Sequence, residues 1–478
     1  MKKTYTLLTL LILAATSCNR EFIELNPVST VSTDILYKTD KDFQDAVVGC
    51  YNVLQDQHGD FWQFGDLRGD DVRNESPSQA PLTRMDNFTL DYNEGILISS
   101  WQRYYRLITR ANTILTRIEG LDQTVITNKD RHVGEARFLR ALAYFDLVRI
   151  YGDVPMVTSL ITTEAAYKLG RDKVDKIYDE VIIKDLLDAE SKLPVSNTGA
   201  NVGRATKGAA KALLGRVYLT RKEFTKAEAK LAEVLPMGYA LLKNYNDLFD
   251  YTKNELHIEY IFDVEYEEGI GEGSPFTNQF VPNVAAFSDF YGVKGNRVES
   301  GASSEEFFAL FTAADLRKDI TIAKGITDKT GKYIPLPSAG VQTFSKKYMT
   351  AVAANNDSKA NWKIIRYADV LLMLAESLNE NGKTTEALTY LNQVRSRAGL
   401  PAISTGTKED IRDKIYTERR LEFYLEGHRW FDLVRTGRAY EVLKSAGMRP
   451  HMTLFPILLA QVQLVNNRAI FPQNSGYE

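Results

Sequence analysis

Long stretches of the chain repeat their hydrophobic residues with the period of an amphipathic helix. A helix is expected to begin near Asp40, because apolar residues follow it at helical spacing: Phe43, Ala46, Val47 and Tyr51. The same period predicts helices over residues 101–120, 132–155 and 173–194, and each of these segments ends at a glycine or a proline. The pattern therefore predicts a mainly helical fold.

Two segments also repeat one internal pattern. In residues 207–235, the positions with fixed spacing are Leu214, Gly215, Tyr218, Ala227, Leu231 and Val234. In residues 368–399, the same distances separate Leu374, Ala375, Leu378, Ala387, Leu391 and Val394. This spacing resembles a tetratricopeptide helix pair, in which small residues let two antiparallel helices approach closely. Because one pair cannot bury its apolar face alone, several pairs are expected to stack.

The helical period is lost between about Met237 and Asn361. The stretch "HIEYIFDVEYEEG" alternates like a strand, with one predicted face formed by Ile258, Tyr260, Phe262 and Val264. Long loops rich in Gly, Ser and Asn follow it, and residues 56–98 form another segment of this kind. Loops of this length inside a compact chain are usually functional or disordered, and their aromatic content favours a function here.

The N-terminus has the pattern of a lipoprotein signal. Two lysines precede a short apolar run, and the small residues after it lead directly to Cys18. We expect residues 1–17 to be a signal peptide, residues 18–39 a tether lipidated at Cys18, and residues 40–478 the folded domain. An ordinary cleaved signal is the alternative. The run is too short to span a bilayer, so the lipid would hold the protein at the membrane.

Within residues 40–478, we expect residues 40–236 and 362–478 to form a mostly helical scaffold. Residues 237–361 are expected to form an irregular, loop-rich part with a few short strands, which would bind the ligand. The chain carries 59 basic and 62 acidic residues, a net charge of −3, so nucleic-acid binding is not expected. The other cysteine, Cys50, lies in an apolar periodic stretch and is predicted to be a buried structural thiol.

The sequence does not predict a cofactor. The five histidines show no metal-type spacing with another His or with Cys, and there is no glycine-rich phosphate loop followed by Lys and Ser or Thr. The aspartate-rich run after Asp66 lacks the full pattern of a calcium-binding loop. We therefore predict no cofactor and assign no metal ligands, and whether a calcium ion binds stays open.

Three segments carry a family resemblance: "EARFLRALAYFDLVRIYGDVP", "NQVRSRAGLP" and "YTERRLEFYLEGHRWFDLVRTG". Together with the N-terminal tether, they make the whole chain resemble the SusD/RagB family of outer-membrane lipoproteins. The resemblance implies a mainly helical fold built on tetratricopeptide-like pairs. It also implies a non-catalytic protein on the cell surface, which captures a glycan or another nutrient and delivers it to a SusC-like TonB-dependent transporter.

The most diagnostic segment of the resemblance, "ERRLEFYLEGHRWFDLVR", has two interpretations. Its carboxylates, histidine and aromatic residues are those of a catalytic or sugar-binding site. Alternatively, it is a buried helix pair around Gly427 that is cross-linked by arginine and glutamate. We favour the second interpretation, because long arginine side chains cover aromatic faces when helices pack.

The predicted ligand site therefore rests on aromatic residues in loops. Sugars stack their C–H faces on flat rings, and their hydroxyls bind polar side chains. The candidate ligand-binding residues combine both kinds of side chain: Trp62, Phe64, Asp66, Arg68, Asp70, Tyr266, Phe276, Asn278, Phe290 and Tyr291. Gln279 is a further polar candidate beside them, whereas Trp101 opens a helix and is expected to lie in the core.

Two other functions remain as alternatives. A surface glycoside hydrolase would need two carboxylates on either side of one bond, and no spacing in the acidic runs brings two together. A tetratricopeptide adaptor would bind other proteins with the concave face of its helix pairs instead of with its loops. The ligand itself stays open among plant, host and microbial glycans and peptides.

Overall fold

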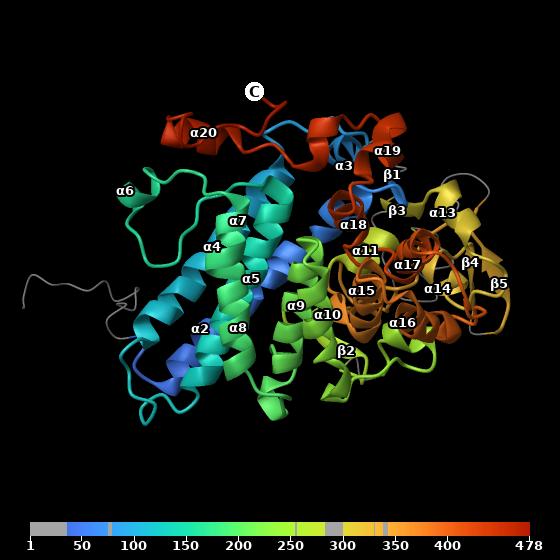
Figure 1. Cartoon of the computed structure of the whole chain (residues 1–478), viewed down its shortest axis with the longest axis horizontal. Coiled ribbons are helices and arrows are strands. Elements are labelled where there is room, and N and C mark those ends of the chain that lie inside the picture. Colours follow the sequence, from blue (N-terminus) through green and yellow to red (C-terminus); the bar gives the residue numbers. More distant parts are fainter. Residues whose placement is uncertain (1–35, 75–78, 254–255, 283–299, 329, 338–342) are drawn as a thin grey trace, which may run out of the picture.

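The computed structural model describes residues 36–74, 79–253, 256–282, 300–328, 330–337 and 343–478. This part of the chain is mainly helical, with three short antiparallel strand pairs (Figure 1). The mainly helical fold with a few short strands that the sequence predicts is confirmed.

The N-terminal part is a layer of long helices on the left of Figure 1. It contains α2 (Asp40–His58), α4 (Gly95–Ile118), α5 (Lys129–Tyr151) and α8 (Ile183–Lys192), and α4 and α5 pack along each other. Thr39 caps α2, since its side chain accepts a hydrogen bond from the backbone of Asp42. The predicted start near Asp40 is confirmed. The helix predicted over residues 101–120 begins six residues earlier, at Gly95.

The two predicted helix pairs are present and stack on each other. The first pair is α9 (Lys207–Thr220) with α10 (Phe224–Ala232), and the second is α15 (Tyr367–Glu380) with α16 (Thr384–Arg397). A Cβ atom added at Gly215 would lie 2.5 Å from Cδ2 of Leu231 on the partner helix, so the close approach needs glycine. Because α10 packs against α15, segments far apart in the sequence form one stack.

The strand predicted around Phe262 forms as β2 (Tyr260–Val264), which pairs antiparallel with β6 (Trp362–Arg366). Phe262 and Val264 are buried, but Ile258 lies before the strand and is exposed, so the predicted four-residue face is only partly right. This pair joins the loop-rich part to the helical scaffold, because β6 leads directly into α15.

Apart from α17 (Lys408–Glu422), the other elements are short. The remaining strands are β1 (Val72–Asn74), β3 (Ser300–Ser303), β4 (Gly325–Thr327) and β5 (Tyr333–Pro335). The remaining helices are η2 (Gln63–Leu67), α3 (Ala80–Asp86), α6 (Thr163–Ala166), α7 (Val174–Ile177), η3 (Tyr178–Ile182), η4 (Gly199–Asn201), η5 (Leu235–Met237), η6 (Tyr245–Phe249), α11 (Phe276–Phe280), α13 (Glu305–Leu310), α14 (Lys318–Thr321), α17 (Lys408–Glu422), α18 (Arg429–Arg435), α19 (Ala439–Leu443), η7 (Lys444–Ala446), η8 (Pro450–Thr453) and α20 (Leu459–Val465). Within the described ranges, none of the helices has the length and apolar character needed to cross a bilayer.

Candidate functional site

The diagnostic segment of residues 418–435 forms the end of α17, a turn around Gly427, and α18. The buried carboxylate of Glu422 lies 2.6 Å from Arg366 and 3.0 Å from Arg317, and it also pairs with Arg397. Burial alone would raise the pKa of Glu422, but the guanidinium groups of Arg397, Arg366 and Arg317 outweigh it and hold that pKa well below its ordinary value. The prediction of a cross-linked scaffold is confirmed.

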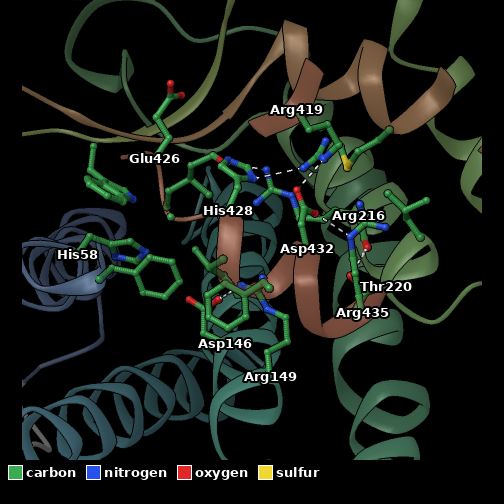
Figure 2. A pocket seen from close by; sticks show the side chains of 18 residues that line it. His58, Asp146, Arg149, Arg216, Thr220, Arg419, Glu426, His428, Asp432 and Arg435 are labelled. Atoms are coloured by element: carbon green, nitrogen blue, oxygen red, sulfur yellow. Dashed lines mark hydrogen bonds and ion pairs between the residues drawn. The ribbon is translucent and has the colours of Figure 1, made fainter. Parts of the chain in front are cut away.

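A small internal cavity lies beside this scaffold (Figure 2). Its volume is about 40 Å³, enough for water but too small for a sugar. Asp432 lies 2.8 Å from both Arg419 and Arg435, so the charges at its wall pair with each other. Burial, helped by Arg216 and Arg419, lowers the pKa of His428 to about 3, so this imidazole is neutral at physiological pH. The cavity belongs to the scaffold.

The aromatic residues predicted near the end of α2 are in the core. Trp62 is 1% exposed and meets the ring of Phe280 edge-on, with centroids 5.2 Å apart. Phe64 is fully buried against Phe455 at the same centroid distance. The prediction that these two rings form an exposed platform for ligand is therefore wrong. The segment forms the short helix η2 and fills the core instead of forming a surface loop.

The charged residues predicted in the same segment are also structural. Asp66 accepts a hydrogen bond of 2.8 Å from the backbone N–H of Gly427. Arg68 donates to the carbonyl of Met85, and its guanidinium lies 3.8 Å from the ring centroid of Phe88. Each of the two side chains is 1% exposed. They are out of reach of a bound ligand, contrary to the prediction.

Asp70 completes this group of buried residues. Its carboxylate lies 2.6 Å from Arg429 and 2.8 Å from Arg420, both in the diagnostic segment. Burial acts to raise the pKa of Asp70, but the two guanidinium groups outweigh it and lower the pKa. Asp70 therefore ties the segment after α2 to the C-terminal scaffold, and its predicted role in ligand binding is wrong.

Tyr266, Phe276 and Asn278 lie around the start of α11. Phe276 is fully buried among aromatic rings and touches no open surface, so its prediction as a ligand contact is wrong. Tyr266 and Asn278 are largely buried as well, but both line a surface cleft. The structure thus brings two of the predicted residues together at an open site.

We call this site the polar cleft. It has a volume of about 500 Å³ and lies between the C-terminal end of α2, the middle of α4, the loop leading into α11, and residues 355–356. Its lining residues are Asn52, Gln55, Asp56, Gly59, Asp60, Arg103, Tyr266, Gly271, Glu272, Gly273, Pro275, Asn278, Gln279, Asn355 and Asn356. Most of these side chains are amides or carboxylates, the groups that bind sugar hydroxyls.

Tyr266 holds the wall of the polar cleft in place. Its hydroxyl donates a 2.7 Å hydrogen bond to the carbonyl of Gln55 in α2, and its backbone N–H donates to the amide oxygen of Asn361. The ring also meets Phe276 edge-on, with centroids 5.5 Å apart. These contacts fix the loop after β2 against α2, so this wall is largely pre-formed.

Amide side chains of α11 and of residues 355–356 also line the polar cleft. Asn278 accepts a 2.7 Å hydrogen bond from the backbone N–H of Asn356, whose φ of +57° puts it in the left-handed region. Ser274 and Ser358 exchange backbone hydrogen bonds and hold the two segments together. The side-chain oxygen of Gln279 is buried and has no hydrogen-bond partner in the protein, so a ligand hydroxyl or a water molecule that reaches it would satisfy it.

Several residues of the polar cleft were missed by sequence reasoning: Asn52, Gln55, Asp60, Arg103, Asn355 and Asn356. For Asn355 and Asn356, the sequence offers one signal, the polar run "NND" in a loop. The other four residues have none, because they belong to helices or follow one. Phe290, Tyr291 and Cys18 lie outside the described residues, so their roles stay predictions. In the part of the chain that the structure describes, no group of three or more His, Cys, Asp or Glu side chains is arranged to hold a metal ion.

Two family profiles match the chain. One, described as "Starch-binding associating with outer membrane", matches residues 21–219, and the other, "SusD family", matches residues 325–471. The chain belongs to the SusD/RagB family. SusD-like protein P2 of Formosa agariphila is 28% identical over the full length of both chains. The starch-binding protein SusD of Bacteroides thetaiotaomicron is 25% identical over 78% of each chain.

Solved structures of SusD-like proteins have the same fold. A laminarin-binding SusD-like protein is 27% identical, with a TM-score of 0.78 over 92% of this chain and 100% of that one. A SusD homologue from Bacteroides thetaiotaomicron, at 23% identity, has a TM-score of 0.79 over 91% of this chain and 97% of that one. The family resemblance inferred from the diagnostic segment is thus confirmed.

Proposed function

We propose that this SusD/RagB-family protein is a non-catalytic, glycan-binding surface lipoprotein, and that the polar cleft is its binding site. One observation carries the proposal: a cleft of about 500 Å³, lined by amides and carboxylates, opens between the helical scaffold and the loop-rich part of a SusD-like fold. Its volume lies within the range of about 300–1,000 Å³ that small-ligand sites occupy. A solved relative described as laminarin-binding supports a glycan as the ligand.

The chemistry of the polar cleft suits hydroxyl groups. A sugar hydroxyl both donates and accepts, so it pairs with the unpartnered oxygen of Gln279 and with the exposed amides of Asn52 and Asn355. Each contact contributes little, because a water molecule is exchanged for a hydroxyl. We therefore expect modest affinity for a free oligosaccharide. The predicted rings Phe290 and Tyr291 follow α11 in the sequence and would add stacking contacts.

Isothermal titration of the purified full chain with a panel of hexasaccharides tests the site. Replacing Gln279→Ala together with Asn355→Ala should weaken binding about fivefold or more, since two hydrogen bonds of about 0.5–1.5 kcal/mol each are lost. Gln393→Ala, an exposed glutamine on α16, is the matched control and should leave the affinity unchanged. Affinity that survives the double replacement but falls in Tyr291→Ala would place the site outside the polar cleft.

The same samples test the hydrolase alternative. Product analysis after long incubation should find intact hexasaccharide, because the proposal assigns no chemistry to the polar cleft. Release of new reducing ends would contradict the non-catalytic assignment. If those ends disappeared in Asp60→Asn, the activity would belong to the polar cleft itself.

We further propose that Cys18 carries the lipid anchor and that the protein delivers its ligand to a SusC-like TonB-dependent transporter in the outer membrane. Support comes from the apolar run that ends at Cys18 and from the profile named for association with the outer membrane. Cys18→Ala should abolish labelling by a radioactive fatty acid and release the protein from the membrane fraction. A transporter that co-purifies with the lipidated form supports delivery. If the protein instead binds only other proteins, through its helix pairs, it is an adaptor and the delivery proposal is contradicted.

A further inference from the structure

The charges around the polar cleft are unevenly distributed. Three carboxylates line it: Asp56, Asp60 and Glu272. Among the described residues that line it, Arg103 is the single cation, and its Nη1 lies 2.9 Å from the Asp60 carboxylate. Each member of this pair is only partly exposed, so the guanidinium is already engaged when the cleft is empty.

The cations just outside the lining are engaged in the same way. Arg106, one turn further along α4, lies 3.7 Å from Asp56. Lys359 lies 3.6 Å from Glu268 at the base of the loop that carries Glu272. In that loop, the backbone N–H of Gly269 is bound by the carboxylate of Asp357, so this donor too faces an anion. Arg103, Arg106 and Lys359, the cations in and directly beside the described lining, therefore each lie within 4 Å of a carboxylate.

From this arrangement we infer that the polar cleft selects uncharged glycans and rejects polyanionic ones, those built from uronic acids or carrying sulfate esters. The inference rests on the proposed function and adds a substrate class to it. Proteins recognise carboxylate and sulfate groups with free arginine forks, lysines or backbone N–H groups. Here Arg103 and the Gly269 N–H already donate to Asp60 and Asp357, and Arg106 and Lys359 each lie within 4 Å of another carboxylate.

The cost of binding an anionic sugar has two parts. A uronate in the polar cleft would lie within about one Debye length, roughly 8 Å, of several carboxylates, so repulsion is not screened away at physiological salt. Arg103 already donates to Asp60 through Nη1, so a uronate bound by its remaining N–H groups would lie beside that carboxylate and repel it. A neutral sugar hydroxyl incurs neither cost, because it can donate a hydrogen bond to a carboxylate while that carboxylate stays paired with its arginine.

Titration with hexasaccharides of equal length tests the inference. The neutral probes are β-1,3-glucan, maltohexaose, cellohexaose and β-mannan hexamers, and the anionic probes are oligogalacturonate, oligomannuronate and sulfated galactan hexamers. We expect at least one neutral probe to bind, with affinity lost in Gln279→Ala/Asn355→Ala. Every anionic probe should bind at least tenfold more weakly than that neutral probe.

The outcomes separate the two proposals. An anionic probe that binds more tightly than every neutral probe, and loses affinity in Gln279→Ala/Asn355→Ala, overturns the charge selection while leaving the polar cleft as the site. A neutral probe whose affinity does not change in that variant overturns the cleft as the site, and binding to no probe overturns the proposed function itself.

A second measurement assigns the selection to individual carboxylates. Glu272→Gln with Asp56→Asn should raise the ratio of anionic to neutral affinity at least threefold in 20 mM salt, and the rise should shrink in 500 mM salt. The matched control is Glu180→Gln with Asp130→Asn, two exposed carboxylates on helices outside the cleft, which should leave the ratio unchanged. A ratio that stays constant in the cleft variant at both salt concentrations contradicts the inference.

Discussion

The carboxylate of Asp66 accepts a 2.8 Å hydrogen bond from the backbone N–H of Gly427, which lies 361 positions away in the sequence. Beside this bond, the backbone of Gly65 packs directly on the backbone of Gly427, whose φ of +78° favours glycine. The contact joins the segment after α2 to the turn between α17 and α18. This long-range contact explains why the segment after α2, which the sequence predicts to be a loop, is held in the core.

Gly65→Ala should destabilise the protein. A Cβ atom at this position would lie 2.5 Å from the carbonyl carbon of Gly427, and backbone cannot move aside as a side chain can. The free energy of unfolding should fall by about 1–3 kcal/mol, measured by denaturant titration. Gly95→Ala is the control, because a Cβ atom there meets nothing within 4 Å. Equal stability of the two variants would contradict the close packing.

Larger residues between the paired helices should also destabilise the protein. Gly215→Leu would overlap Leu231, and Ala387→Leu would enlarge a fully buried position of the second pair, the one that corresponds to Ala227 in the first. Each replacement should reduce the free energy of unfolding by about 1–3 kcal/mol, seen as a lower Tm. Ala229→Leu, on the exposed side of α10, should melt like the parent protein. Unchanged melting of all three variants would refute the tetratricopeptide-like packing.

Glu422→Gln should be more damaging than the loss of a surface charge. It removes the carboxylate shared by Arg317, Arg366 and Arg397, all buried, so each arginine loses one of its carboxylate partners. Removing one partner of a buried ion pair lowers the free energy of unfolding by about 3–5 kcal/mol. Glu441→Gln, which breaks the exposed pair with Lys444, should leave the unfolding midpoint unchanged.

The effect of Glu422→Gln should depend on pH. The pKa of Glu422 is lowered in the folded protein, whereas an unfolded glutamate titrates near about 4.3. The stabilisation is therefore complete above that pH and is lost as the pH falls toward the folded-state pKa. Denaturant titrations at pH 7, 5 and 3 should show the gap between parent and variant narrowing at pH 3. A gap that widens in acid would contradict this assignment.

Cys50 should be inert in the folded protein. Its side chain is fully buried in α2, and burial raises the pKa of the thiol to about 12. In a Cys18→Ala background, Ellman's reagent at pH 8 should modify Cys50 only after denaturant is added. Adding Val48→Cys, an exposed position of the same helix, provides a positive control that should react at once. Rapid modification of Cys50 without denaturant would contradict the predicted structural role.

The helices and their pairing could be predicted from the sequence because the signal is local. Thr39 and the apolar residues after it specify the start of α2, and the repeated spacing around Gly215 and Ala375 specifies two helix pairs. The diagnostic segment around Gly427 identified the family for the same reason, since its residues are contiguous. Hydrophobic period, capping and short motifs all act within a few turns of chain.

The candidate site could not be predicted in this way, because burial depends on partners that are distant in sequence. Trp62 and Phe64 have the composition of a binding platform, but Phe280 and Phe455 cover them. The polar cleft forms only when the Ser274–Ser358 pairing brings Asn356 to Asn278, and when α2 and α4 place Asp60 beside Arg103. Local sequence alone therefore determined the helices, whereas long-range packing decided which polar and aromatic side chains face solvent, since exposure is a property of the folded chain.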